Sequence, residues 1–428
     1  MTKFSSSWLL SAALVVQLVA GSPLEYNPYT PGGKTVALDA GHPAHGAQLP
    51  EDSGAERSAD GPEDLARLEN FFGVQMMYKF TDLPRKGGID PIPWPASYWP
   101  MFQDSINYKW DKKQASPAEK YAKAFGLNVK QFMDSVSRNT GVLSQTSKKA
   151  CSNDFECFFN GDGSMCAKRD GERRGYCIPT WFGICHAWAP AALLEAEPIC
   201  PVVKNGVTFQ PVDIKALMSM AYDGAHLDTV FTGTRFNGKD NEPNNKDQYG
   251  RFKDQTRRDL GAGFFHIATA NMLGNLNHSF IVDVSAGAEV WNQPVRSYQV
   301  LEATKIDPST AGRKYFKTNG YPFNAAASKL MYVKTLFRWI VESSENGPLV
   351  SNPSKIDKST KSAEYTYILE LDDDDNILGG EWVDRSIDNH PDFLWFATGK
   401  PPMDTVTAVG LAYKNVVELL DASVEGRC

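Results

Sequence analysis

The spacing of apolar and polar residues predicts a helical region in the first half of the chain. Residues 62–81 and 116–138 carry apolar side chains at helical spacing, and both segments have acidic residues in their first turns. The second segment begins with Ser116-Pro117, a common helix start signal. The Pro- and Trp-rich residues 91–102 separate the two segments. We therefore expect a helical N-terminal domain over residues 62–150.

The later pattern predicts a further helix and several strands. Residues 185–197 are rich in Ala and Leu and are read as a helix. Residues 264–272 and 280–284 are read as two strands joined by the turn GNLNHS, although a run as short as the first also fits a helix. Strand-forming residues on both sides of the acidic run 372–375 predict a hairpin.

The first residues indicate secretion. Residues 1–21 contain one Lys, an apolar run and small residues near Ala20 and Gly21, as in a cleaved signal peptide. Residues 22–61 are rich in Gly, Pro, Ser and acidic residues and are predicted to be a linker or propeptide. We expect the two histidines of this stretch, His42 and His45, to lie on the surface.

Composition excludes two classes of partner. The chain has 428 residues, of which 42% are hydrophobic and 22% charged, with a net charge of −7. Such a composition is that of a globular protein, and an acidic surface disfavours nucleic acids and anionic membranes. No stretch after the signal is apolar for the roughly 20 residues that a membrane span needs.

An odd number of cysteines leaves one thiol over in an oxidising compartment. Four of the seven cysteines lie in the polar residues 151–178, which predicts a small module held by two disulfides. Cys200 and Cys428 could form a third bridge, although sequence alone does not decide pairings. By elimination, Cys185 is the free cysteine.

The surroundings of Cys185 predict a nucleophile. Trp181, Phe182 and Gly183 precede it and a predicted helix follows, so the helix dipole is expected to lower the thiol pKa. This pattern resembles the papain-like superfamily, in which the nucleophile opens the central helix. The resemblance implies an α+β fold with a papain-like cysteine-peptidase-type catalytic core over residues 179–428. Pro190 departs from the pattern, because a proline there is expected to break or kink the helix.

A base and an orienting group are predicted from the two strands that follow. Adjacent strands over 264–272 and 280–284 would bring His266 beside Asp283, as in the papain-like pattern. A carboxylate next to an imidazole fixes its tautomer and leaves the other nitrogen to accept the thiol proton. Cys185, His266 and Asp283 are therefore the predicted nucleophile, base and orienting residue.

A second assignment uses His278 with Glu302. Residues 298–304 look like the segment of animal-type transglutaminases that carries their third catalytic residue. Asn277-His278-Ser279, however, is a glycosylation sequon in a predicted turn, and a glycan there would obstruct catalysis. His266 is accordingly the preferred base.

Residues 290–302, VWNQPVRSYQVLE, closely resemble the thirteen-residue signature of the oomycete transglutaminase elicitors. Residues 290–296 follow the signature without a break, and Val300 and Glu302 rejoin it. Four positions depart from its commoner residues: Ser297, Tyr298, Gln299 and Leu301. From its residues alone, the segment with Trp291, Asn292, Gln293 and Pro294 is expected to form a rigid corner, exposed or half-buried.

The resemblance implies a secreted, calcium-dependent enzyme that joins protein Gln and Lys side chains through a Cys thioester and triggers plant defence. Its partners would be proteins with accessible Gln and Lys and a plant immune receptor. The calcium ligands are unknown, and residues 372–375 are one candidate site. The backbone N–H of Cys185 and the Trp181 indole are candidate oxyanion donors. Trp181, Trp188 and Trp291 could form an apolar rim that excludes water.

Two rival functions share these sequence features. A papain-like cysteine protease would use the same triad with water as the acceptor. A non-catalytic secreted elicitor would need only the segment 290–302. The protease would cut its protein substrate into fragments. The elicitor would still be recognised by the plant after loss of the Cys185 thiol.

Overall fold

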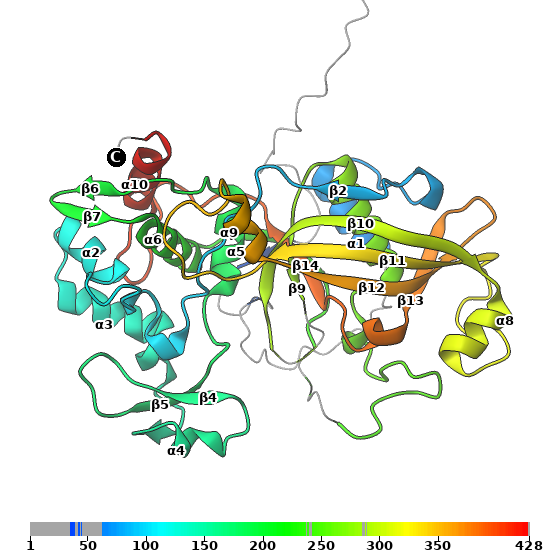
Figure 1. Cartoon of the computed structure of the whole chain (residues 1–428), viewed down its shortest axis with the longest axis horizontal. Coiled ribbons are helices and arrows are strands. Elements are labelled where there is room, and N and C mark those ends of the chain that lie inside the picture. Colours follow the sequence, from blue (N-terminus) through cyan, green and yellow to red (C-terminus); the bar gives the residue numbers. More distant parts are fainter. Residues whose placement is uncertain are drawn as a thin grey trace, which may run out of the picture.

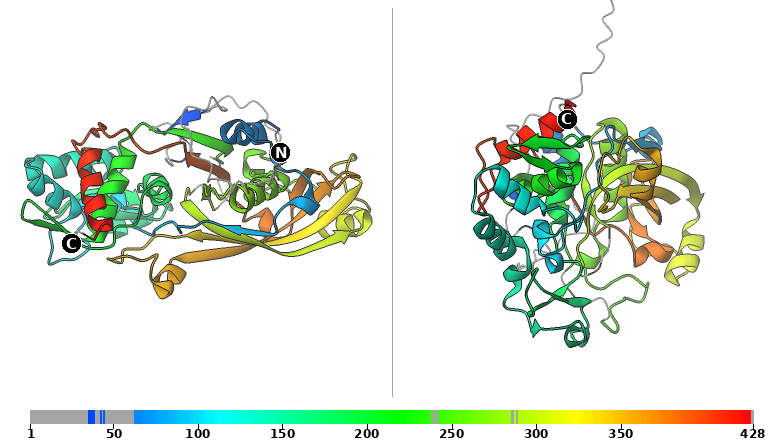
Figure 2. Two further views of the ribbon diagram at one scale, coloured as in Figure 1. Left: turned by 90° about the horizontal axis from the view of Figure 1, so that it is seen from above. Right: turned by 60° about the vertical axis from the view of Figure 1, so that its left-hand side comes forward.

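The computed structural model describes residues 35–38, 42, 44, 62–236, 238, 242–284, 287 and 289–426. Helices gather at one end of an elongated molecule, and long antiparallel strands extend from them toward the other end (Figures 1 and 2). The mixture of helices and sheet confirms the predicted α+β class. No described helix is long and apolar enough to span a membrane.

One antiparallel sheet of nine strands dominates the described chain. Its order is β1-β8-β14-β9-β10-β11-β12-β13, and β2 pairs with β10 outside this path. The strands are β1 (Thr35–Ala37), β2 (Lys86–Gly88), β8 (Asp228–Gly233), β9 (Ile281–Asp283), β10 (Asn292–Ile306), β11 (Lys329–Ile340), β12 (Thr360–Leu371), β13 (Ile377–Trp382) and β14 (Phe393–Ala397). In β11 the alternate residues Val333, Thr335 and Phe337 are buried, as expected when one face of a sheet covers a core.

Most of the longer helices lie at one end of this sheet, and small sheets lie beside them (Figure 1). The longer helices are α1 (Pro62–Phe72), α2 (Pro117–Ala124), α3 (Val129–Thr140), α5 (Cys185–Leu194), α6 (Pro211–Asp223), α7 (Ala262–Thr269) and α10 (Tyr413–Val424). The shorter helices are α4 (Phe155–Phe158), α8 (Pro308–Ala311) and α9 (Pro353–Lys358). The small sheets comprise β3 (Ala150–Cys151), β4 (Ser164–Ala167) and β5 (Gly175–Pro179), and β6 (Val202–Lys204) with β7 (Val207–Phe209).

Two predicted helices are correct in place and wrong in length. α1 ends at Phe72 because Gly73 adopts a φ of 65°. Residues 73–79 are therefore not helical as predicted, and Phe80–Asp82 form a separate short 3₁₀ helix. The segment 116–138 forms two helices, α2 and α3, separated at Gly126 with a φ of 70°. The side chain of Ser116 accepts the Glu119 backbone N–H at 3.2 Å, which confirms the predicted helix start.

The predicted module at residues 151–178 contains the two expected disulfides. They join Cys151 to Cys166 and Cys157 to Cys177. Cys200 lies beside α10, with its Sγ 3.4 Å from the carbonyl oxygen of Ser423. Its suggested partner, Cys428, lies outside the described residues.

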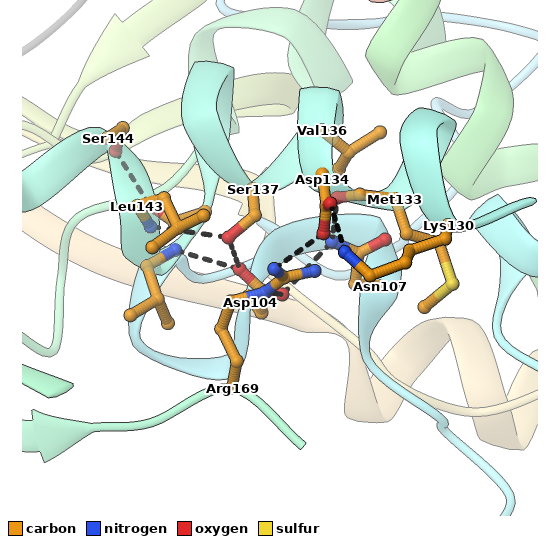
Figure 3. A network of polar contacts seen from close by, with 12 residues as sticks. Asp104, Asn107, Lys130, Met133, Asp134, Val136, Ser137, Leu143, Ser144 and Arg169 are labelled. Carbon is orange, nitrogen blue, oxygen red and sulfur yellow. Dashed lines mark hydrogen bonds and ion pairs between the residues drawn. The ribbon is translucent and has the colours of Figure 1, made fainter. Parts of the chain in front are cut away.

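A partly buried polar network attaches this module to α3. Arg169 donates to Asp104 at 3.1 Å and to Asp134 of α3 at 2.7 Å. Asp104 also accepts the Ser137 hydroxyl and the Val142 backbone N–H (Figure 3). Because the same carboxylate serves the module and α3, the module has a fixed position relative to the helical end of the molecule.

A buried ion pair fixes α2 against α6. Lys120 lies 2.5 Å from Asp213, and their side chains are 5% and 0% exposed. We expect Lys120→Met to lower the free energy of unfolding by about 3–5 kcal/mol, because it leaves a buried carboxylate without its cation. Urea titration followed by circular dichroism measures the change.

The control for this prediction is the same substitution in an exposed pair. Lys130→Met removes a lysine that is 87% exposed and pairs with Asp134. That change is expected to cost less than about 1 kcal/mol. Equal losses for the two variants would show that the buried pair has no special role in stability.

Candidate active site

Cys185 is a free thiol and the first residue of α5. The turn before it is held by the Ile184 backbone N–H, which donates to the Tyr98 carbonyl at 2.8 Å. A Cβ on Gly183 would lie 2.5 Å from that same carbonyl oxygen, so only glycine fits the approach. The contacts of Gly183 and Ile184 with Tyr98 thereby fix the turn that positions the Cys185 sulfur.

α5 continues through Pro190 to Leu194, so the proline does not break the helix, and the expected kink stays a prediction. Pro190 removes one intrahelical donor, and the tight packing of a helix buried almost throughout keeps the remaining turns in place. Trp188 is fully buried in α5, and its indole N–H donates to the Trp94 carbonyl at 3.1 Å. Trp188 is therefore a core residue and does not form the predicted rim.

The sulfur faces the start of β10, and Cys185 as a residue is 5% exposed. Asn292 Nδ2 lies 3.5 Å from Cys185 Sγ, and the Val290 carbonyl oxygen lies 3.9 Å from it. Burial raises the thiol pKa to about 11; hydrogen bonds from Asn292 lower it, and the charges of Glu342 and Asp283 raise it further. The predicted lowering of the thiol pKa is therefore wrong for the buried thiol, because the effect of burial exceeds that of the helix dipole.

Asp283 is the one predicted partner that lies near the sulfur. It ends β9 opposite Asn292, and its Oδ1 accepts the Trp291 backbone N–H at 3.0 Å. The guanidinium of Arg235 interacts electrostatically with Asp283, and burial and the charge of Asp283 raise the pKa of the nearby Asp392 carboxyl well above its usual range. The end of β9 thus carries a buried, charged cluster beside Cys185.

His266 lies in α7, so the predicted strand over residues 264–272 is wrong. The small and aromatic residues of α7 form helical turns, and these turns pack against β12 and β13. The Nδ1 of His266 lies 2.7 Å from the Tyr367 hydroxyl, its ring packs against Phe80, and burial lowers its pKa to about 4. The strand argument that placed His266 beside Asp283 therefore fails, and its role as base stays a prediction.

His278 and Glu302, the alternative pair, lie in different surroundings, and their catalytic role stays a prediction. The ring of His278 packs against Phe71, Phe72 and Phe396. Glu302 is exposed on β10, opposite Lys334 of β11. Asn277, the residue of the glycosylation sequon, is exposed as its predicted turn requires.

The signature segment is largely buried, which corrects the predicted corner. Trp291 is half-buried, and its ring packs edge-on against Tyr98 with centroids 5.4 Å apart. Asn292, Gln293 and Pro294 are buried in β10, where they pair with β9. Gln293 donates to Glu342 at 2.7 Å. The first half of the segment therefore belongs to the wall of the site rather than to the surface.

Two predicted accessory features have different outcomes. Trp181 is half-buried with its ring against Phe182 at 4.6 Å, and its role as an oxyanion donor stays a prediction. The side chains of the acidic hairpin at 372–375 do not converge as a group of cation ligands in the described structure. Asp372 accepts three hydrogen bonds within its own turn, and Asp375 pairs with Lys329 at 2.7 Å. Calcium dependence therefore stays a prediction, with no ligand set assigned.

Sequence reasoning missed the neighbours that the N-terminal segment brings to the site. His42 is 1% exposed, not a surface residue, because β1 adds a strand to the edge formed by β8. Its ring packs against Trp395, and its Nε2 lies 3.1 Å from the Thr229 hydroxyl. The carbonyl of Ala44 accepts from Asn292 Nδ2 at 2.9 Å. His45 lies outside the described residues.

Comparison with known proteins agrees with the signature. A family described as transglutaminase elicitor matches residues 64–426. The solved structure of the GP42 transglutaminase from Phytophthora sojae is 50% identical, with a TM-score of 0.78 over 86% of this chain and 99% of that chain. A search of curated proteins finds no match. The chain belongs to the transglutaminase elicitor family.

Proposed function

We propose that this protein transfers the γ-glutamyl group of a protein glutamine to a lysine amine, with Cys185 as the nucleophile. The observation that carries the proposal is the free thiol at the start of α5, which faces Asn292 at the start of β10 and Asp283 at the end of β9. Membership in the family and the similarity to GP42 support the reaction class.

The chemistry follows from the thiol. The sulfur attacks the glutamine carboxamide, ammonia leaves, and a lysine amine then takes the acyl group from the thioester. The predicted triad of Cys185, His266 and Asp283 stays part of this proposal, and Asp283 is the member whose charge acts on the sulfur. The aromatic pair Tyr98 and Trp291 borders the site and would favour an amine over water as the acceptor.

Incubation with casein and a fluorescent amine tests the reaction. We expect labelled casein and high-molecular-mass polymer after incubation, both visible by gel electrophoresis, with ammonia released in step with the label. Casein fragments without label would indicate a papain-like protease instead. Addition of EDTA to the same assay tests the predicted calcium dependence.

We also propose that the N-terminal segment is a propeptide that covers this site before activation. The backbone of β1 pairs with β8, and Leu38, His42 and Ala44 are buried against the catalytic end of the molecule. The Ala44 carbonyl oxygen accepts a hydrogen bond from the side-chain amide of Asn292, and a substrate would also need to reach this amide. Removal of this segment would accordingly activate the enzyme.

Secretion and host recognition complete the proposal. Two disulfides in the described chain suit the extracellular compartment that the signal peptide predicts. A plant receptor that contacts Asn292 or Pro294 would require the segment to leave the sheet, because these residues are buried. Gln299, Leu301 and Glu302 are the exposed residues of the signature in the folded protein.

A further inference from the structure

The side-chain amide of Asn292 has a fixed orientation beside the sulfur. The Trp395 indole N–H donates to Asn292 Oδ1 at 2.8 Å. An indole nitrogen can only donate, so this contact identifies the oxygen of the amide and directs Nδ2 the other way. Nδ2 lies 3.5 Å from Cys185 Sγ. Asn292 is fully buried, so the amide cannot turn to water.

Asn292 presents a second donor to the same sulfur. Its backbone N–H also lowers the pKa of Cys185 through a hydrogen bond. The position of this backbone is set by β10, where Asn292 pairs with Asp283 of β9. One residue thus aims two N–H groups at the place where negative charge develops during attack by a thiol.

The N-terminal segment marks where a carbonyl oxygen fits. The Ala44 carbonyl oxygen lies 2.9 Å from Asn292 Nδ2, the same atom that approaches the sulfur. A substrate carboxamide has an oxygen of the same kind. The Asn292 amide beside Cys185 therefore already binds a carbonyl oxygen at hydrogen-bond distance.

We infer that Asn292 is a catalytic residue that holds the carboxamide oxygen of the glutamine substrate, an inference that rests on the proposed transferase function. When Sγ bonds to the carboxamide carbon, the carbonyl electron pair moves onto the oxygen, and Nδ2 donates to the resulting oxyanion. The pair then returns and the carbon–nitrogen bond breaks. The nitrogen leaves as ammonia with the proton that the thiol gave up.

The test uses Asn292→Ala in protein with an engineered protease site between residues 51 and 60, cut before the assay. We expect kcat for amine incorporation to fall about 100-fold, with KM for the glutamine substrate changed less than about threefold. Alkylation of Cys185 by iodoacetamide forms no oxyanion. At pH 10.5 its rate should stay within about threefold of wild type.

A second variant keeps the amide and removes its orienting partner. Trp395→Phe should lower kcat about tenfold, because the amide can then turn away from the oxyanion. Ser219→Ala, a small change in α6, is the folding control, since its hydroxyl bonds only within its own helix to the Lys215 carbonyl. Thermal unfolding of each variant shows whether the fold is kept.

Two outcomes would overturn the assignment. The amide does not act on an oxyanion if Asn292→Ala keeps kcat within about threefold of active wild type. The same conclusion holds if the rate of alkylation at pH 10.5 falls by as large a factor as kcat. If wild type is alkylated at Cys185 yet incorporates no amine, the proposed function fails and this inference fails with it.

Discussion

Replacement of Cys185 by alanine is expected to lower amine incorporation by at least about 10⁴-fold, to the background rate. The sulfur forms the thioester, and no other described cysteine is free to replace it, because the remaining ones are in disulfides. Label transfer to casein, measured with and without the segment 22–61 cut away, gives the rate. Mass mapping after iodoacetamide treatment should find the added mass on Cys185 in wild type.

The control separates loss of the thiol from loss of the fold. Ser219→Ala changes a buried side chain in α6 and should keep full activity. Cys185→Ala should also keep the plant response to the segment 290–302 if recognition and catalysis are separate functions. Residual incorporation above about 1% of wild type in Cys185→Ala would exclude Cys185 as the nucleophile.

Local signals in the sequence predicted the free thiol and the disulfide module. An odd cysteine count and a polar segment with four cysteines are sufficient to identify a free thiol, because oxidation pairs the others. Gly183 and the following Ala-rich run predicted the turn and the helix, since both depend on neighbours within a few residues. Features of this kind can be predicted without knowledge of the tertiary structure.

Features that depend on distant contacts were missed. Residues 264–272 fit a helix and a strand equally well, and packing of α7 against β12 and β13 decides for the helix. The thiol pKa depends on burial by segments far away in the chain, and a helix dipole alone predicts the wrong direction. His42 was expected at the surface because a Gly- and Pro-rich stretch gives no sign that β8 offers it an open edge.

The signature segment 290–302 combines a local sequence signal with roles that depend on distant contacts. Its residues identify the family, but their roles appear only in the sheet. Asn292 and Gln293 read as a recognition motif in the sequence, whereas in the fold they contact Cys185 and Glu342. One segment can thus identify the family and at the same time form part of the wall around Cys185.

Cutting the chain between residues 45 and 61 is expected to raise amine incorporation at least about 100-fold. That ratio corresponds to a covered state favoured by roughly 3 kcal/mol. Once the segment leaves, water and substrate reach Asn292, and the thiol pKa should fall from about 11, because burial is the main cause of its rise. Iodoacetamide alkylation at pH 7.5 should therefore quicken on cutting, since more of the thiol is ionised at that pH.

Addition of the free peptide separates this effect from a general loosening of the protein. A synthetic peptide of residues 35–44 should inhibit the cut enzyme in competition with the glutamine substrate, because both need the Asn292 amide. The same peptide with His42 replaced by alanine should inhibit less, since it loses the ring contact with Trp395 and the bond to Thr229. If uncut protein incorporates amine and alkylates Cys185 as fast as cut protein, the segment does not cover the site in solution.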